Sequence, residues 1–200
     1  MSTLLLVRHG ETEWHAENRY AGTSDVALTE RGLRQAERLG EFLAAQPEPP
    51  VALYCSPQSR AQRTAEPSAK ALGLAIETVE GLREVHFGVA EGRVLGELPA
   101  DLVERFRADP VAGAFPGAEP PVEAAARGVR TLREIAAREA GGRVLVVTHN
   151  TFLRLTLCQL LGIPLARYRT VFPRLDNAAI TEVTIDGENI GLRRFNQPAE

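Results

Sequence analysis

The sequence predicts an α/β fold built around a mainly parallel sheet. Short apolar, β-branched runs alternate with longer segments in which apolar residues recur at helical spacing, as strand–helix–strand units do. The chain has 200 residues, of which 44% are hydrophobic and 24% are charged. This length suits one medium-sized domain, and these proportions are ordinary for a globular protein. We therefore expect residues 1–200 to form a single domain.

Two strand–helix units and a third strand are predicted in the first 80 residues. The run Leu-Leu-Leu-Val at 4–7 is typical of a buried strand. A helix is predicted over 29–45, because Thr29 can cap its N-terminus and Leu33, Ala36 and Leu39 fall on one face. The proline-rich segment 46–50 ends this helix. A strand at 51–55, a helix at 60–72 that ends at Gly73, and a short strand at 75–79 follow.

The second half of the chain continues the alternation after an irregular segment. Residues 91–121 are rich in glycine, proline and charge, with one helical stretch near 100–107, and we interpret them as a lid-like insertion. Helices are then predicted at 124–139 and 152–161, with a buried strand at 143–148 between them. Strands at 179–185 and 190–195 flank Asp186-Gly187, a hairpin signal. The helical spacing of four arginines predicts a solvated helix face: Arg127, Arg130, Arg133 and Arg138.

Charge and composition exclude several classes of protein. The net charge of -3 and pI of about 5.9 imply no broad basic field, so nucleic acid is a poor candidate partner. The apolar N-terminal stretch has no basic leader and is too short for a signal peptide or a membrane span. Cys55 and Cys158 each lie in an apolar segment, which predicts buried, reduced thiols. We expect a cytoplasmic protein, and the sequence leaves open whether it forms a homodimer.

The residues that carry chemistry come directly after three predicted strands. Arg8 and His9 follow the first strand, a turn leading to Arg60 follows the second, and His149 follows the strand at 143–148. Ligands of open α/β sheets bind beyond the carboxyl ends of the strands. We therefore expect these two arginines and two histidines to converge at one edge of the sheet, where Glu84 can join them from the loop 82–88.

This set of side chains suits phosphoryl transfer. Arginine presents a planar fork of donors that matches phosphate oxygens and stays charged at any working pH. An imidazole nitrogen can attack phosphorus and carry the phosphoryl group, while a second histidine stabilises the developing charge. A carboxylic acid can protonate the leaving alkoxide and then activate water. Since the chain shows no metal-ligand spacing, we expect neither a metal nor another cofactor.

Four motifs identify a family that the chain resembles. They are Leu-Val-Arg-His-Gly-Glu-Thr-Glu-Trp at 6–14, with its continuation to Gly32, Ser-Pro-Gln-Ser-Arg-Ala-Gln-Arg-Thr-Ala at 56–65, the stretch 82–88 with Glu91-Gly92, and Thr148-His149. With these motifs the chain resembles the histidine phosphatase superfamily, which includes the cofactor-dependent phosphoglycerate mutases. The similarity spans nearly the whole chain in the expected order. It implies a three-layer α/β/α sandwich.

The resemblance also implies roles for the site residues. Arg8, Arg60 and His149 would hold phosphate, His9 would be the nucleophile and Glu84 the proton donor. Other carboxylates near Glu84 in sequence are alternatives for the last role: Glu11, Glu80 and Glu91. The chain departs from the family at His15, where the family often has asparagine, and after His149, where the family commonly has a small residue. We expect three further side chains to contact the substrate: His15, Asn150 and Thr23.

The predicted function is that of a phosphatase acting on small-molecule phosphate monoesters through a phosphohistidine. One alternative is a 2,3-bisphosphoglycerate-dependent phosphoglycerate mutase. The chain resembles such mutases at residues 84–88, where His86 and Phe87 are mutase-like. Such mutases usually carry a longer insertion with basic residues, whereas the segment 91–121 contains no lysine, and this favours hydrolysis. A non-catalytic phosphate-binding module is the other alternative. Four aromatic residues are candidates for the wall of a substrate pocket, although single aromatics more often serve in packing: Trp14, Tyr20, Phe87 and Phe115.

Overall fold

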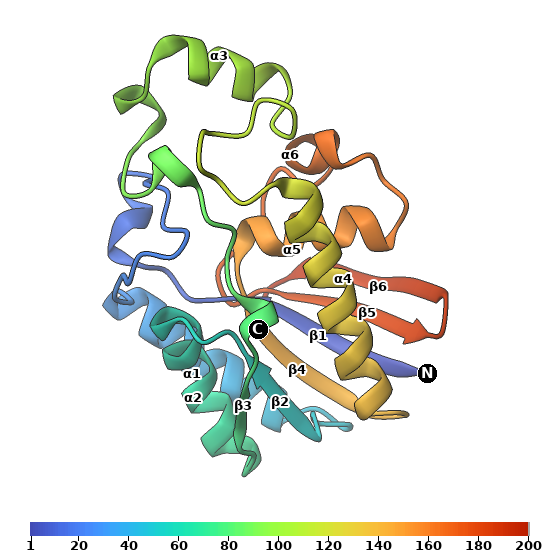
Figure 1. Ribbon diagram of the computed structural model, residues 1–200. Helices are drawn as coiled ribbons and strands as arrows, with labels where there is room; N and C mark the ends of the chain where they lie inside the picture. The colour runs from blue at the N-terminus through green and yellow to red at the C-terminus, as the bar shows by residue number, and fades with distance from the viewer. Residues whose placement is uncertain (200) are drawn as a thin grey trace.

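A computed structural model describes residues 1–199 and contains a six-stranded sheet in the order β3-β2-β4-β1-β5-β6 (Figure 1). The strands β1 (Ser2–Arg8), β4 (Arg143–Thr148), β2 (Ala52–Cys55) and β3 (Ile76–Thr78) pair in parallel. β5 (Ile180–Asp186) runs antiparallel to β1, and β6 (Asn189–Gln197) runs antiparallel to β5. The predicted mainly parallel α/β sheet is confirmed.

Helices cover both faces of this sheet. α1 (Glu30–Ala44) and α2 (Ser59–Leu72) lie on one face, and α4 (Pro121–Arg138) and α5 (Asn150–Leu160) lie on the other (Figure 1). Successive strand residues point to opposite faces, so Leu5 and Val7 pack in the cluster that holds α1 and α2. Leu4 and Leu6 pack in the cluster that holds α4 and α5. The predicted three-layer α/β/α sandwich is confirmed.

Most predicted element boundaries agree with the structure to within a few residues. The side chain of Thr29 accepts a hydrogen bond from the backbone N–H of Gly32, so the predicted cap of α1 is confirmed. α4 begins at Pro121, three residues earlier than predicted, because proline fits the first turn of a helix. α5 also begins earlier, at Asn150, which places Asn150 and Thr151 in its first turn directly after His149.

The segment 91–121 contains η4 (Leu95–Glu97) and the helix α3 (Ala100–Ala108), which stands away from the sheet in Figure 1. Phe106 of α3 stacks on Phe115, with 4.6 Å between ring centroids. Tyr20 packs edge-on against both rings. This aromatic cluster joins the insertion to the loop that follows β1. The remaining short elements are η1 (Glu13–His15), η2 (Glu80–Leu82), η3 (Gly88–Ala90), η5 (Leu165–Arg167) and α6 (Tyr168–Val171).

The prediction of a solvated arginine face is wrong for Arg127, which is buried. Its guanidinium binds both carboxylate oxygens of Glu119 at 2.8 and 2.9 Å. It also donates to the carbonyl oxygens of Gly81 and Arg83 at 2.8 and 3.0 Å. These bonds satisfy the charge inside the protein, and sequence spacing alone could not reveal them. Arg127 thereby connects the end of the insertion to the loop that carries Glu84.

Two further observations concern the chain as a whole. Cys55 and Cys158 are free and buried, as predicted, and burial raises the pKa of the Cys55 thiol. Over residues 1–199, the structure has no helix with the length and apolar character needed to cross a bilayer.

Candidate active site

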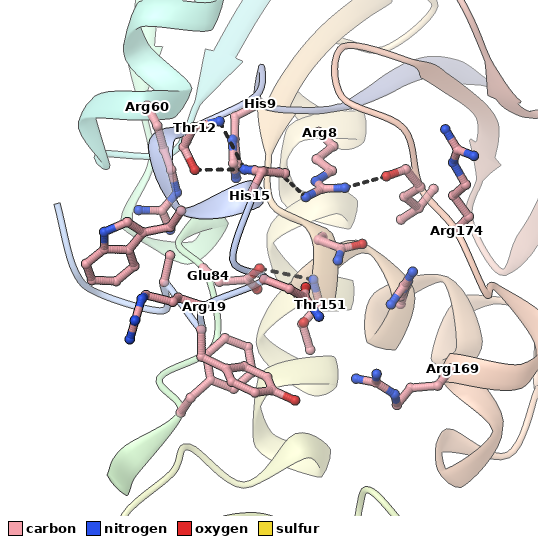
Figure 2. Close-up of a pocket in the computed structure, with 18 of the residues that line it drawn as sticks. Arg8, His9, Thr12, His15, Arg19, Arg60, Glu84, Thr151, Arg169 and Arg174 are labelled. Atoms are coloured by element: carbon pink, nitrogen blue, oxygen red, sulfur yellow. Dashed lines mark hydrogen bonds between the residues drawn. The ribbon is translucent and has the colours of Figure 1, made fainter. Parts of the chain in front are cut away.

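The carboxyl ends of three parallel strands meet at one edge of the sheet. Arg8 at the end of β1 lies beside Thr148 at the end of β4, and Val147 lies beside Cys55 at the end of β2. A cavity of about 390 Å³ opens beyond this edge. Figure 2 shows its wall, which includes six of the predicted site residues: Arg8, His9, His15, Arg60, Glu84 and Asn150.

His9 presents one free ring nitrogen. Its Nδ1 lies 2.8 Å from the carbonyl oxygen of Gly10, which can only accept, so Nδ1 carries the proton and Nε2 keeps its lone pair. Burial, together with the charges of Arg60 and Arg8, lowers the pKa of His9 well below its usual value. The ring is therefore neutral at physiological pH and can act as a nucleophile.

The backbone beside His9 depends on a close approach between two glycines. A Cβ atom at Gly10 would lie 2.6 Å from the carbonyl oxygen of Gly32, in the first turn of α1. The loop after β1 can lie against α1 only because position 10 has no side chain. The Gly10 N–H also donates to the Thr64 hydroxyl at 2.9 Å, which ties the loop to α2.

Arg8 is oriented by two acceptors. It donates to the carbonyl oxygen of Leu175 at 2.6 Å and to Nε2 of His15. Three of its five N–H groups have no acceptor among the described residues, and its Nε is buried. Burial, with the charge of Arg154 acting in the same direction, lowers the pKa of Arg8 to about 10, so it stays charged at neutral pH.

Arg60 lies in the first turn of α2 and is fully buried. It donates to the carbonyl oxygens of Ser24 and Gly22, both at 2.8 Å, and its Nε has no partner within the described chain. Burial lowers its pKa. Neither Arg60 nor Arg8 forms an ion pair with a described carboxylate. Their charges and remaining N–H groups are therefore available for an anion.

Glu84 is the carboxylate in the described cavity wall, and it is held by the N-terminus of α5. Its Oε1 accepts from the backbone N–H groups of Val85 and Phe152 at 2.9 and 2.8 Å. Its Oε2 accepts from Thr151 N–H alone, at 3.0 Å. Each carboxylate oxygen has about two acceptor positions. Oε1 is thus saturated, whereas Oε2 keeps one position that can carry a proton.

His149 lies beside His9, with ring centroids 5.2 Å apart, but it is fully buried and does not itself line the cavity. Its Nε2 lies 2.7 Å from the hydroxyl oxygen of Ser56, and its Nδ1 has no described partner. If the Ser56 hydroxyl donates to Nε2, Nδ1 is left as an N–H donor. Burial lowers the pKa of His149 well below its usual value, so this ring too is neutral.

His15 orients Arg8. Its Nε2 faces an N–H of Arg8, and its Nδ1 accepts from the backbone N–H of Thr12 at 3.0 Å and lies 2.8 Å from the Thr12 hydroxyl oxygen. Burial and the Arg8 charge lower the pKa of His15 to about 4. The histidine at this position, where the resembled family often has asparagine, therefore places a neutral ring beside the Arg8 guanidinium.

The other predicted site residues occupy different places. Asn150 lines the cavity with a buried, unpartnered Oδ1. Thr23 is exposed outside the cavity wall, and its backbone N–H donates to Glu91. Glu11 and Glu91 are held by other hydrogen bonds outside the wall. Glu80, His86 and Phe115 also lie outside it, whereas Trp14, Tyr20 and Phe87 line it. Among residues 1–199, no cluster of three potential metal-ligating side chains occurs.

Sequence reasoning missed several residues that shape the site. Gln58 joins two parts of the pocket, because it accepts from Glu84 N–H at 2.8 Å and donates to Gly22 O at 2.6 Å. Asn177 donates to the carbonyl oxygen of His9 at 2.8 Å. Three arginines from the last third of the chain also line the cavity: Arg154, Arg169 and Arg174. Of these three, only Arg154 could have been noticed in the sequence, because it is a charged residue within the apolar helix predicted after His149.

Comparison with known proteins agrees with this geometry. Residues 4–198 match the family model described as histidine phosphatase superfamily (branch 1). A Klebsiella pneumoniae protein named "Probable phosphoglycerate mutase GpmB" is 36% identical over 92% of this chain and 85% of its own length. Phosphoserine phosphatase 1 of Hydrogenobacter thermophilus is 33% identical over 98% of this chain and 92% of its own. The solved structure of Bacillus stearothermophilus YhfR has a TM-score of 0.90 at 30% identity and covers 98% of both chains.

Proposed function

The chain belongs to the histidine phosphatase superfamily and is a phosphatase of that superfamily, and we propose that it hydrolyses small phosphate monoesters through a phosphoryl group carried by His9. The observation that carries this proposal is the hydrogen bond between Nδ1 of His9 and the carbonyl oxygen of Gly10. Its Nδ1–H is bound to Gly10 O, which leaves the Nε2 lone pair free in a cavity walled by Arg8 and Arg60. A neutral nucleophile between two unpaired guanidinium groups suits attack on a phosphate dianion.

The proposed reaction has two displacements. In the first, Nε2 of His9 forms a bond to phosphorus, the bond between phosphorus and the ester oxygen breaks, and Oε2 of Glu84 gives its proton to the leaving alkoxide. In the second, Glu84 takes a proton from water, the water oxygen attacks phosphorus, and the bond to His9 breaks. Inorganic phosphate leaves, and both side chains return to their starting protonation states.

Charge in the transition state would be stabilised by donors that already have fixed positions. The unused N–H groups of Arg8 and Arg60 support this role, because their acceptors hold the guanidinium planes in place before substrate arrives. His149 does not line the cavity, but its ring lies beside that of His9 and its Nδ1 is unpartnered among the described residues, which supports it as a further donor to a phosphoryl group held at His9. Each such donor is typically worth about 10²–10³ in kcat.

A phosphoglycerate mutase is the second candidate, because the Klebsiella pneumoniae relative carries that name. A mutase would use the same phosphohistidine but return the group to a second oxygen of the substrate. The absence of lysine from residues 91–121 favours water as the acceptor. Incubation with 3-phosphoglycerate distinguishes the two, since a phosphatase releases inorganic phosphate and a mutase forms the 2-phospho isomer.

The test of the proposal is to trap the intermediate. Acid-labile, base-stable phosphoprotein should accumulate when the enzyme is mixed rapidly with ³²P-labelled ester and quenched in alkali. His9→Ala should abolish both the label and turnover. His86→Ala is the matched control, because His86 lies outside the cavity wall. Full activity of His9→Ala would disprove the mechanism, and a folded wild-type protein that neither turns over nor becomes labelled would support a non-catalytic module.

The proposal extends to partners and location. The substrate class is a free small-molecule ester, as the phosphatase name of the Hydrogenobacter thermophilus relative supports. The net charge of -3 supports the expectation that nucleic acid is not a partner. A cytoplasmic location and a homodimer stay predictions, which fractionation of cells and sedimentation of the purified protein would test.

A further inference from the structure

We propose that Arg154 and Arg169 form a second anion-binding subsite that holds a carboxylate in the organic part of the substrate. The enzyme would then prefer phosphate monoesters of carboxylic acids over neutral phosphate esters. This inference rests on the proposed function, because the subsite lies in the wall of the same cavity as His9, Arg8 and Arg60.

Arg154 is a buried cation with unused donors. It lies on α5, one turn after Asn150, and only 8% of its surface is exposed. It donates to the carbonyl oxygen of Pro173 at 2.8 Å, while its Nε is buried without a partner among the described residues. Burying a charge without a counter-charge is unfavourable. An anion in the cavity would supply that counter-charge.

Arg169 adds a second positive charge to the same wall. It lies on α6, and its guanidinium carbon is 5.2 Å from the centroid of the Phe106 ring. The two arginines are close enough to act on each other: burial first, and then the charge of Arg169, lowers the pKa of Arg154. Figure 2 shows Arg169 on the side of the cavity away from Arg60. An anion bound between the two guanidinium groups would relieve their repulsion.

The neighbouring arginines already have counter-charges. Arg174 pairs with Asp176, and Arg19 lies in ion-pair range of Glu17 and Glu97. Within the described chain, the cavity arginines without an ion pair are thus Arg8, Arg60, Arg154 and Arg169.

The balance of charge in the cavity leaves a place for an anion besides the phosphate. The proposed reaction begins with Glu84 protonated, so the four unpaired arginines give the described wall an excess of four positive charges. A phosphate dianion at His9 leaves two of these charges, which we assign to Arg154 and Arg169. The planar fork of arginine matches a carboxylate in geometry, so we infer a carboxylate as the second anion.

The experiment compares two esters that differ only in this group. In 3-phosphoglycerate a carboxylate occupies the place of the hydroxymethyl group of glycerol 3-phosphate. Hydrogen bonds to charged groups are worth about 1.5–3 kcal/mol, so the wild-type kcat/KM should be about 10- to 100-fold higher for the carboxylate ester. Arg154→Met and Arg169→Gln should each lower this ratio about tenfold or more. Arg167→Gln is the control, because Arg167 is exposed, two residues from Arg169, and outside the cavity wall.

Three outcomes would overturn the inference. The wild-type enzyme could show no preference for the carboxylate ester, or Arg169→Gln could slow both esters equally. The choice of carboxylate would be overturned if the enzyme preferred 1,3-propanediol bisphosphate over propyl phosphate by a larger factor than it prefers 3-phosphoglycerate over glycerol 3-phosphate. If Arg154→Met does not fold, the exposed Arg169 decides the test. Failure of the proposed function can be distinguished from failure of the subsite. If the protein is not a phosphatase, nitrophenyl phosphate will not be hydrolysed either.

Discussion

Replacing Glu84 by glutamine should slow cleavage of alkyl phosphates far more than cleavage of aryl phosphates. Nitrophenolate leaves without protonation, whereas an alkoxide needs the proton that we assign to Oε2 of Glu84. General acid catalysis is typically worth about 10²–10⁴ in rate. The glutamine variant should lose this factor for an alkyl ester and keep most of the rate for nitrophenyl phosphate.

The surroundings of Glu84 add a second effect, common to both esters. A glutamine oxygen can replace Oε1 and accept from Val85 and Phe152, but its NH₂ group then faces the Thr151 N–H. Two donors facing each other leave a buried group unsatisfied, at a cost of about 1–3 kcal/mol. Displacement of the side chain can therefore slow both esters by about fivefold to a hundredfold. The absolute rate cannot separate the two effects, but the ratio of the two esters can.

The assay is a single-turnover measurement of alcohol release with enzyme in excess of substrate. Only the first displacement is then observed, so the role of Glu84 in activating water does not contribute. The alkyl-to-aryl ratio of rate constants should fall by about 10²–10⁴ in Glu84→Gln. Glu91→Gln is the matched control, because Glu91 accepts from Phe87 N–H and the Ser24 hydroxyl outside the cavity wall. Equal losses for both esters in Glu84→Gln would refute the assignment of Glu84 as the acid.

Three further predictions follow from the same geometry. Arg8→Lys should lower kcat by about 10²–10³, because an ammonium group cannot bind Leu175 O, His15 and phosphate in the geometry of the guanidinium. Steady-state kinetics at saturating substrate will measure this loss. His15→Phe removes an acceptor from Arg8 and should lower kcat/KM about 10- to 100-fold, whereas His15→Asn should restore part of it; equal losses would exclude an acceptor role. The free energy of unfolding should fall as the pH drops below about 6.5, because unfolded histidines then bind protons that folded His9, His15 and His149 do not. For His15 this loss continues down to its pKa of about 4, and urea unfolding at several pH values measures it; a flat profile would show that the rings are not held neutral.

The edge of the sheet could be predicted because its determinants are local in the sequence. The apolar run before Arg8 and the run before His149 each predict a buried strand that ends at a polar residue. Parallel strands bring those ends to one edge without any further information. The arrangement of His9, Arg8, Arg60 and Glu84 around one cavity therefore follows from strand positions and motifs alone.

The hydrogen bonds that set protonation and orientation could not be predicted in this way. The partner of His15 Nδ1 is Thr12, three residues away, but the partner of its Nε2 is Arg8, and Arg8 in turn binds Leu175, far along the chain. The donors to Glu84 include the first turn of α5, 67 residues later. Such contacts depend on how separate loops meet above the sheet, and no spacing rule specifies them. Thr23 shows the same limit, because we expected it to contact the substrate, whereas it is exposed and lies outside the described cavity wall.

The segment 91–121 shows why composition was a weak guide to substrate. Its lack of lysine favoured hydrolysis over the mutase reaction but identified no group that would bind the organic part of the substrate. In the structure the added positive charge on the cavity wall comes instead from Arg154 of α5 and Arg169 of α6. The insertion contributes indirectly, since Phe106 of α3 lies under the guanidinium of Arg169. A Phe106→Leu variant should therefore weaken the preference for a carboxylate by loosening Arg169, even though Phe106 does not line the cavity. An unchanged preference would show that α6 alone positions Arg169.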